Sequence, residues 1–254
     1  MKYIISLIIR KVPRKYLQKV SHIGLRILAI FYAGNNVLDP ISGKTYRKFL
    51  PYGRINPREN ALSPGSLSLE RHRLMWLYLK EKTNFFSAPL KVLHIAPEYC
   101  FLKLFDAMKN LDYITADIES PLAKVKMDVH NIPFETDTFD VCFCNHVMEH
   151  VESDIKAMRE IHRVLKPGGW AIIQSPIDYT LEKSFEDPSI TDPTERERVY
   201  GQNDHVRQYG RDYKEHLERA GFIVTEDDYV MQMPPEEVKK YGLDPQEFVY
   251  FCRK

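Results

Sequence analysis

Short apolar runs alternate with amphipathic segments through the second half of the chain, from residue 91 onward. The runs have the length and composition of strands that are buried on both faces of a parallel sheet. They are Lys91–Ile95, Asp112–Ala116, Val141–Asn145 and Trp170–Gln174, with a shorter one at Lys124–Met127. Between the last two long runs, Ile155, Met158, Ile161 and Leu165 recur at helical spacing, and Lys166 to Gly169 is expected to end that helix in a turn. Strand, helix and strand in this order predict parallel, right-handed crossovers and an α/β fold.

A long polar insert, at about residues 178–210, interrupts this alternation. It is rich in charge and lies between the strand that ends at Gln174 and a predicted helix at Arg211–Ala220. Because long loops inside compact domains are usually functional, we interpret the insert as a substrate lid. Two further strands are expected at Phe222–Asp228 and Glu247–Cys252.

Residues 1–38 form a basic arm with an amphipathic pattern. The arm has seven Lys or Arg residues and no acidic residue, interleaved with Ile and Leu. Its apolar runs are shorter than the roughly 20 residues that a transmembrane helix needs, and their order does not fit a signal peptide. Two interpretations remain: a surface helix on an anionic membrane or acidic partner, or helices that pack on the catalytic domain and leave a solvated basic face.

Residues 39–68 contain two turns, Asp39-Pro40-Ile41-Ser42 and Ser63-Pro64-Gly65-Ser66. Their spacing looks like the paired knuckles of a zinc ribbon. Hydroxyls are poor zinc ligands, so we expect no metal here, and no metal site elsewhere in the chain. Packing of aromatic and aliphatic side chains should hold the turns instead; the candidates are Tyr46, Phe49, Leu50 and Tyr52. A helix at Leu69–Lys82 should then open the main domain, which extends to residue 254, with Leu74, Leu77 and Tyr78 inward and Glu70, Arg71 and Arg73 outward.

Charge and cysteine content narrow the functional classes. The 36 basic and 35 acidic residues nearly cancel, so no global field favours nucleic acid. The four cysteines, Cys100, Cys142, Cys144 and Cys252, lie in or beside apolar segments without metal-ligand spacing. Reduced, buried thiols in a cytoplasmic protein are the interpretation, with contact at the inner face of the membrane as an additional role for the arm.

Two aspartates follow successive predicted strands. Asp117 ends one strand and Asp128 ends the next, so both should lie at the edge of the sheet where ligands bind. A carboxylate at Asp117 can accept both ribose hydroxyls of an adenosine ligand, while Asp128 and the Val129 amide can meet the adenine. Either aspartate alone is equally well explained as a loop cap, but the pair favours a ligand. Asn145, His146 and Ser175 end other strands at the same edge.

Three features occur together: Asp117, the block DVHNIPFETDTFDVCFCNHVMEHV at 128–151, and REIHRVLKPGGWAIIQSPI at 159–177. With them, residues 91–228 resemble the class I S-adenosylmethionine-dependent methyltransferases, of the type 11-like group. The first loop, LHIAPE at 93–98, and the late motif DHVRQYG at 204–210 are similar to a bacterial subgroup with a cysteine ribbon in front. The resemblance implies a Rossmann-like sheet of seven strands, mostly parallel with an antiparallel last strand, behind a small helical and ribbon-like extension.

The resemblance also implies S-adenosyl-L-methionine as the cofactor. In the first loop Ala96, Glu98 and Cys100 replace the usual three glycines, and Glu98 can instead meet the ammonium of the cofactor. The cofactor-binding residues that follow from the resemblance and from the strand ends are His94, Ala96, Pro97, Glu98, Asp117, Ile118, Asp128, Val129, Asn145 and His146.

Methyl transfer mainly requires the acceptor to be held in line with the methyl group, and a hydroxyl acceptor also benefits from a base. The candidates for these catalytic tasks are His146, Glu149, His205 and Tyr209, whereas His150 can simply cap or pack. The predicted acceptor is a small molecule, a glycan or a lipid-linked intermediate. A methyltransferase fold that has lost activity and serves as a binding or scaffold protein is the alternative. A nicotinamide-dependent oxidoreductase is disfavoured because no GxGxxG follows the first strand.

Overall fold

The computed structural model describes residue 24 and residues 29–53 and 57–254. Most of the basic arm predicted at residues 1–38 lies outside this part; within the described part, a strand already begins at Ala33. Contacts divide the chain into two compact units. Unit 1 comprises residues up to Lys82 together with Val230–Glu247, and unit 2 comprises Thr83–Tyr229 and Phe248–Lys254. This division places residues 69–82 and 230–247 outside the methyltransferase-like unit, whereas the sequence analysis assigned residues 69–254 to one domain.

Among its described residues, unit 1 contains two small antiparallel hairpins and two helices that follow them along the chain. The strands are β1 (Ala33–Asp39) paired with β2 (Lys44–Tyr46), and β3 (Leu50–Tyr52) paired with β4 (Arg58–Leu62). The helices are α3 (Glu70–Lys82) and α8 (Pro235–Tyr241), and the 3-10 turn η1 (Tyr229–Gln232) precedes α8. Tyr46, Phe49 and Leu50 are buried as expected, but Tyr52 is 45% exposed, so it does not take part in the packing.

The Asp39 carboxylate joins the two turns of the ribbon-like segment. It accepts hydrogen bonds from Ser42 Oγ at 2.8 Å and from Ser63 Oγ at 2.7 Å, as well as from the Ile41 amide at 3.0 Å. Ser66, in the second turn, bonds a neighbouring serine: its Oγ lies 2.8 Å from Ser68 Oγ. A buried carboxylate with this many donors is well satisfied, so hydrogen bonds brace the place where a ribbon would hold an ion.

Arg73 does not face outward as the helical pattern predicted. It is fully buried, and its guanidinium donates to the carbonyl oxygens of Ala61, Ser68, Tyr241 and Gly242 at 2.6–2.9 Å. It also stacks 4.2 Å from the centroid of the Phe49 ring. A single side chain therefore ties α3 to β4 and to the end of α8, which a one-dimensional hydrophobic pattern cannot show.

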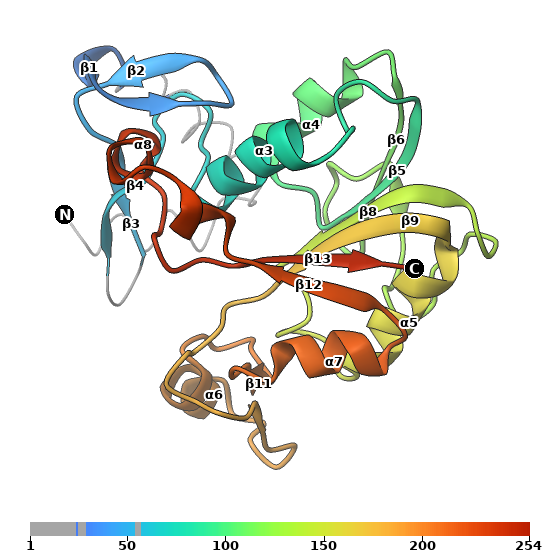
Figure 1. Cartoon of the computed structure of the whole chain (residues 1–254). Helices are drawn as coiled ribbons and strands as arrows, with labels where there is room; N and C mark the ends of the chain where they lie inside the picture. The colour runs from blue at the N-terminus through green and yellow to red at the C-terminus, as the bar shows by residue number, and fades with distance from the viewer. Residues whose placement is uncertain (1–23, 25–28, 54–56) are drawn as a thin grey trace. The chain divides into compact units, whose positions relative to one another are not determined.

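Unit 2 contains the predicted seven-stranded sheet, in the order β12-β13-β9-β8-β5-β6-β7 (Figure 1). Strands β5 to β9 pair in parallel, and β13 runs antiparallel to both of its neighbours. The Rossmann-like fold class is therefore confirmed. The strands are β5 (Leu90–Ile95), β6 (Leu111–Asp117), β7 (Val125–Lys126), β8 (Phe139–Asn145), β9 (Leu165–Gln174), β12 (Ile223–Asp227) and β13 (Val249–Arg253).

Helices cover both faces of this sheet. Figure 1 shows α4 (Tyr99–Asp106) on one face and α5 (Asp154–Val164) with α7 (Tyr213–Arg219) on the other. Cys142 and Cys144 point to the α5 side, where they belong to the same buried cluster as Met158 and Ile161. Burial raises the pKa of both thiols, and all four cysteines are buried thiols outside any disulfide, as the sequence analysis expected.

The turn expected at Lys166–Gly169 is instead part of β9. Helix α5 ends at Val164, and β9 starts at Leu165, where Phe139 pairs with Leu165. The register shifts before Val141 pairs with Trp170, so the intervening residues form a bulge within the strand. Gly168, at φ +78°, supplies the left-handed conformation that this bulge needs.

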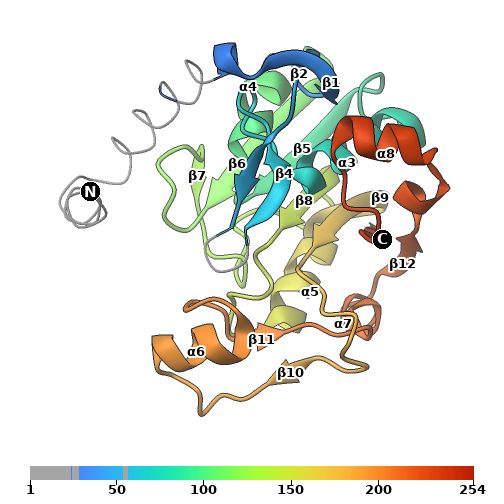
Figure 2. The same cartoon turned by 90° about the vertical axis from the view of Figure 1, so that its left-hand side faces the viewer.

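The insert at 178–210 forms a small substructure of its own. It contains a two-stranded hairpin, β10 (Phe185–Glu186) with β11 (Arg207–Gln208), and the helix α6 (Pro193–Tyr200). Figures 1 and 2 show these elements on the side of the sheet that carries α5 and α7. Within the described residues, no helix is both long and apolar enough to cross a bilayer.

Candidate active site

The first loop, after β5, keeps the left-handed turn that a glycine-rich loop would make. Ala96 has φ +49°, and its amide donates to Ala116 O at 2.9 Å. For alanine this conformation costs about 1 kcal/mol, an amount the surrounding hydrogen bonds can offset. Ala96, Pro97 and Glu98 are each partly exposed, so this loop is open to a ligand despite its lack of glycine.

Glu98 links the first loop to the end of β8. Its Oε1 accepts from Asn145 Nδ2 at 2.9 Å, and its Oε2 lies 2.5 Å from His94 Nε2. Because β5 and β8 are adjacent parallel strands, their carboxyl ends meet at one edge, as the sequence predicted. A partly exposed carboxylate at this edge suits a cationic group such as an amino-acid ammonium.

His94 lies behind Glu98 and is fully buried. Its Nδ1 lies 2.7 Å from the hydroxyl of Tyr113, and its ring packs among Phe101, Phe105 and Phe143. With both ring nitrogens in use and no exposed surface, His94 orients Glu98 rather than presenting an edge to a ligand.

Asp117, at the end of β6, uses one carboxylate oxygen to shape its own loop. Oδ1 accepts the amides of Glu119 at 2.7 Å and Ser120 at 2.6 Å. No hydrogen bond to Oδ2 is found among the described residues, and one carboxylate oxygen has the lone pairs to accept two hydroxyls. The next side chain, Ile118, is 57% exposed, which places an apolar surface beside the carboxylate.

Asp128 and Val129 follow β7 at the same edge. Asp128 is exposed and its Oδ1 accepts from the amide and from the ring Nδ1 of His130, both at 2.8 Å. The backbone hydrogen bond from His130, together with its side chain, lowers the pKa of Asp128. Val129 is buried in the core, so its backbone rather than its side chain is the part that a ligand can meet.

A second group gathers after β8. His146 has φ +54°, and its Nδ1 lies 3.3 Å from Glu149 Oε1, while Ser175 Oγ at the end of β9 donates to Glu149 Oε2 at 3.1 Å. Burial alone would raise the pKa of Glu149, but the hydrogen bond and charge of His146 outweigh it and lower that pKa. The result is an imidazole oriented by a buried carboxylate, the arrangement of a general base.

His205 also reaches this group from the insert. The amide of the next residue, Val206, donates to Glu149 O at 2.9 Å, and the His205 ring lies 4.7 Å from the His150 ring, centroid to centroid. Burial lowers the pKa of His205. The structure thus brings His146, Glu149 and His205 together at the carboxyl edge, and their catalytic roles stay a prediction.

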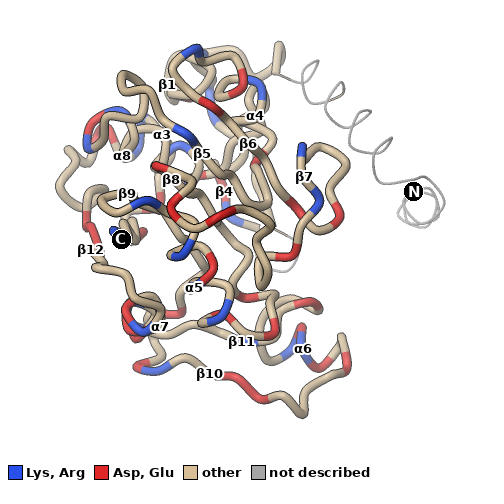
Figure 3. Tube along the Cα trace, turned by 90° about the vertical axis from the view of Figure 1, so that its right-hand side faces the viewer, with Lys and Arg blue, Asp and Glu red and all other residues tan. Residues whose placement is uncertain are grey.

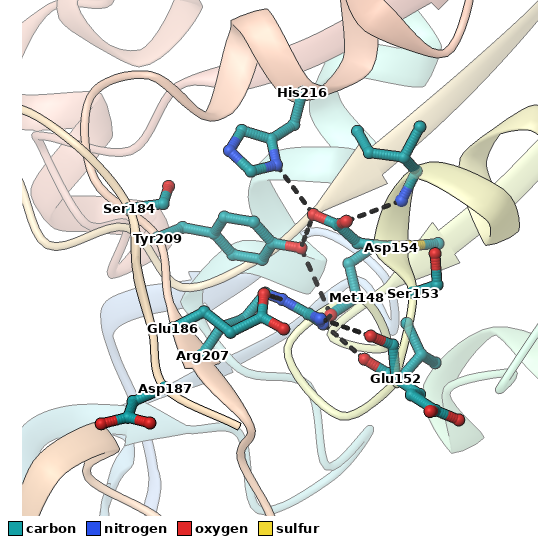
Figure 4. A network of polar contacts seen from close by, with 12 residues as sticks. Met148, Glu152, Ser153, Asp154, Ser184, Glu186, Asp187, Arg207, Tyr209 and His216 are labelled. Atoms are coloured by element: carbon teal, nitrogen blue, oxygen red, sulfur yellow. Dashed lines mark hydrogen bonds and ion pairs between the residues drawn. The ribbon is translucent and has the colours of Figure 1, made fainter. Parts of the chain in front are cut away.

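Tyr209 is placed differently from these three. It is fully buried, and its hydroxyl donates to Asp154 Oδ2 at 2.9 Å and lies 3.3 Å from Met148 O (Figure 4). Burial, Tyr213 and Asp154 raise its pKa well above the ordinary value, so the hydroxyl stays protonated. Its position is that of an anchor between the insert and the start of α5.

Arg207 is the strongest anchor of the insert, and the sequence analysis missed its role. Its guanidinium donates to the carbonyl oxygens of Met148, Val151 and Glu152 at 2.5–3.0 Å and to Glu186 Oε2 at 3.0 Å. Figure 4 shows it beneath Tyr209 and pointing into the loop after β8. The motif DHVRQYG contains Arg207 and Tyr209, but a motif does not name the distant carbonyls that they bind.

Charge is evenly distributed around this site. Figure 3 shows basic and acidic positions interspersed along unit 2, including α6, where Glu195, Arg196, Glu197 and Arg198 alternate. The mixed signs along the chain agree with the near-zero net charge.

Comparisons with known proteins find matches to the core of unit 2. The sequence profile of the methyltransferase domain family matches residues 99–173. The ubiquinone/menaquinone biosynthesis C-methyltransferase UbiE of Idiomarina loihiensis is 35% identical over 65 residues, which cover 24% of this chain and 26% of that protein. The tRNA U34 carboxymethyltransferase of Nautilia profundicola is 26% identical over 132 residues, 52% of this chain and 41% of that protein.

A solved structure gives the same fold. The 4+2 cyclase SpnF matches with a TM-score of 0.50 and 15% identity, over 72% of this chain and 80% of its own. The chain spans less than half the length of the two sequence relatives, so the activities of those relatives are not assigned to it. The matched profile and the strand order together show that the core of unit 2 is similar to the methyltransferase domain family.

Proposed function

We propose that unit 2 transfers a methyl group from S-adenosylmethionine to an acceptor that binds between the loop after β8 and the insert. One observation carries this proposal: Glu98, held by His94 and Asn145, joins the first loop to the β8 end. This contact keeps a carboxylate where the cofactor's ammonium would lie, although the loop has no glycine. It is also the observation that argues against the inactive scaffold.

The cofactor would lie along the ends of β5 to β8. Asp117 Oδ2 would accept the ribose hydroxyls, and the exposed Ile118 would cover one face of the adenine. Asp128 and the Val129 amide would meet the adenine edge, and Glu98 would hold the ammonium. Asn145 and His146 then border the methyl end.

Binding and deprotonation of the acceptor would depend on His146, Glu149 and the insert. When bound, the cofactor supplies an electrophilic methyl on a sulfonium. His146, oriented by Glu149, would take the proton of a hydroxyl acceptor as its oxygen bonds the methyl carbon, while the carbon–sulfur electron pair stays with sulfur. Tyr209 and Arg207 would act as positioning residues, because their polar atoms already bind the α5 start and the β8 loop.

For the acceptor we propose a small molecule, a glycan or a lipid-linked intermediate. Relatives named for quinone methylation and the interspersed charge support a small acceptor over nucleic acid, although one relative is named for a tRNA base. For the basic arm at residues 1–38 we propose peripheral contact with the inner face of the membrane in the cytoplasm. Pelleting of the full chain with anionic vesicles at low salt, but not with neutral vesicles, is the expected result.

Isothermal titration with S-adenosylhomocysteine tests the cofactor assignment. We expect one site per chain, with affinity at least tenfold weaker in Asp117→Ala and unchanged in Glu119→Ala, whose side chain is exposed in the same loop. Absence of heat at millimolar ligand, in a chain shown by circular dichroism to be folded, would favour the inactive scaffold. Equal affinity in the two variants would remove Asp117 from the site.

A further inference from the structure

Three potential metal ligands meet where the insert touches the loop after β8. They are Glu149, His150 and His205, and one ligand atom from each lies within 4.8 Å of the others. The two histidines are 55 positions apart in sequence, and the loop and the insert come together through the Val206 amide and Glu149 O. This juxtaposition explains why the sequence analysis expected no metal.

His205 provides a second, independent observation. Its side chain is 5% exposed, yet Nε2 is buried with no hydrogen-bond partner among the described residues. The ring also makes a hydrogen bond to the backbone of Tyr200, which must therefore use Nδ1. In that tautomer Nε2 carries a lone pair, and leaving a buried polar atom unpaired costs about 1–3 kcal/mol.

His150 is oriented in a similar way. Its Nδ1 lies 3.3 Å from the carbonyl oxygen of Asp204 and 3.6 Å from Asp204 Oδ2. Metal-binding histidines commonly give one nitrogen to a carbonyl or carboxylate and the other to the ion. Both rings therefore have the orientation in which Nε2 is the nitrogen left for an ion.

We propose that Glu149, His150 and His205 bind a divalent transition ion, with Zn²⁺ as the best match. Two imidazoles and one carboxylate are ligands typical of zinc and other first-row ions, whereas Mg²⁺ and Ca²⁺ prefer oxygen alone. Ligand atoms around tetrahedral zinc lie about 3.4 Å apart, and these three lie within 4.8 Å of one another, so the wider separations must shorten. His150 is the exposed member and can make that adjustment by rotating.

Packing alone is the competing explanation for the two rings. They meet edge to face, at an interplanar angle of 83°, which is a favourable aromatic geometry. That contact accounts for the ring positions, but it does not satisfy His205 Nε2. An ion accounts for both.

Such an ion would have two consequences. It would fasten the insert to the loop after β8, adding to the anchors made by Arg207. It would also lie beside Glu149, which orients His146, with coordination positions left for an oxygen of the acceptor. This second consequence rests on the proposed methyl transfer, whereas the ion site itself does not.

Metal binding to the purified, chelator-treated full chain tests the site. We expect one equivalent of Zn²⁺ by isothermal titration at pH 7, a higher melting temperature with Zn²⁺, and Co²⁺ visible absorption typical of nitrogen and oxygen ligands. Affinity should fall more than tenfold in His205→Gln and in His150→Gln. His162→Gln, which changes a histidine on the far part of α5, should bind as the parent does. Because His150 is exposed, its variant should keep the parent circular dichroism and remain interpretable even where His205→Gln is destabilised.

Binding that is equal in all three variants, no binding at micromolar Zn²⁺, or thiolate charge-transfer bands with Co²⁺ would each overturn the site. S-adenosylhomocysteine titration of the same metal-free sample keeps the two proposals separate. Absence of zinc binding together with normal S-adenosylhomocysteine binding would refute only the ion site. The reverse result refutes only the methyl-transfer assignment.

Discussion

Replacing Asp154 by Asn should destabilise unit 2 in a strongly pH-dependent way. Asp154 is 6% exposed at the first turn of α5, and its Oδ2 accepts from Tyr209 Oη at 2.9 Å and pairs with His216 Nδ1 at 2.8 Å. Arg207 lies nearby with its positive charge (Figure 4). The asparagine keeps the volume of the side chain, removes the charge and replaces one acceptor oxygen by an amide donor.

The magnitude follows from the pKa of this carboxyl. Burial acts to raise it, but His216, Arg207 and Tyr209 together lower the pKa of Asp154 from 3.8 to about 2. That difference corresponds to about 2.5 kcal/mol of folding free energy at neutral pH. Because the folded pKa lies below the unfolded value, the stabilisation is complete above about pH 5 and is lost as the pH falls through the folded pKa. At pH 3 roughly half of it should remain.

Thermal unfolding of parent and variant between pH 7 and pH 3 measures this contribution. At pH 7 the variant should melt about 5–10 °C lower, and the gap should narrow steadily below pH 4. Limited proteolysis should cut the insert faster in the variant, since Tyr209 loses its charged acceptor. Asp187→Asn is the matched control: among the described residues, this partly exposed carboxylate in the insert accepts hydrogen bonds from Ser189 alone, so the melting temperature should change far less.

Two results would contradict the reasoning. A gap in melting temperature that is the same at pH 7 and pH 3 would mean that the charge of Asp154 is not what stabilises the fold. Equal melting temperatures at pH 7 would mean that the network in Figure 4 does not hold the insert.

Three further substitutions probe other parts of the molecule. Asp39→Asn puts an amide among the Ser42 and Ser63 hydroxyls and should lower the folding stability by about 1–3 kcal/mol. Hydrogen exchange at residues 39–43 and 63–68 should accelerate. Unchanged exchange would show that Asp39 does not brace the turns. Glu98→Gln removes the negative charge and leaves one oxygen for its two partners, His94 and Asn145, so S-adenosylhomocysteine should bind about tenfold more weakly. The same affinity would refute the ammonium contact. Tyr209→Phe should lower stability by about 1–2 kcal/mol and leave that affinity intact, and a loss of affinity at unchanged stability would instead place Tyr209 at the ligand.

The strands of unit 2 were predictable because a buried parallel strand is a local signal. The run VCFCN identified β8, which proved two residues longer at its start, and the runs for β5 and β6 were equally close. The parallel arrangement then fixed which residues share the carboxyl edge. Asp117, Asn145 and His146 could therefore be placed near one another without any coordinates.

Features that depend on distant partners were not predictable in this way. Arg73 has the position of a solvent-facing residue on its helix, but its four carbonyl partners come from three other segments of unit 1. Likewise, Asp154 at the start of α5 is held by side chains 55 and 62 residues later. Each of these contacts joins segments whose proximity is set by tertiary packing.

Helix α8 is a different kind of omission, since its signals were present. Pro235 at its first turn, followed by Glu236 and Glu237, is a typical helix start, and Gly242 at φ +58° is a typical end. The short length of the helix kept its apolar pattern too weak to stand out. Start and stop signals would have found it where periodicity did not.

Glu149 connects three separate parts of this site. Its carbonyl oxygen holds the insert through Val206, one carboxylate oxygen lies against His146, and the other accepts from Ser175 at the end of β9. A substitution of its side chain would disturb both His146 and the end of β9, so its effect could not be assigned to either one. The informative changes are at the outer members, His146, His150 and His205, each of which alters one arm of the group. If the insert selects the acceptor, changes at His150 and His205 should affect acceptor turnover while leaving S-adenosylhomocysteine affinity within about twofold, a difference of about 0.4 kcal/mol.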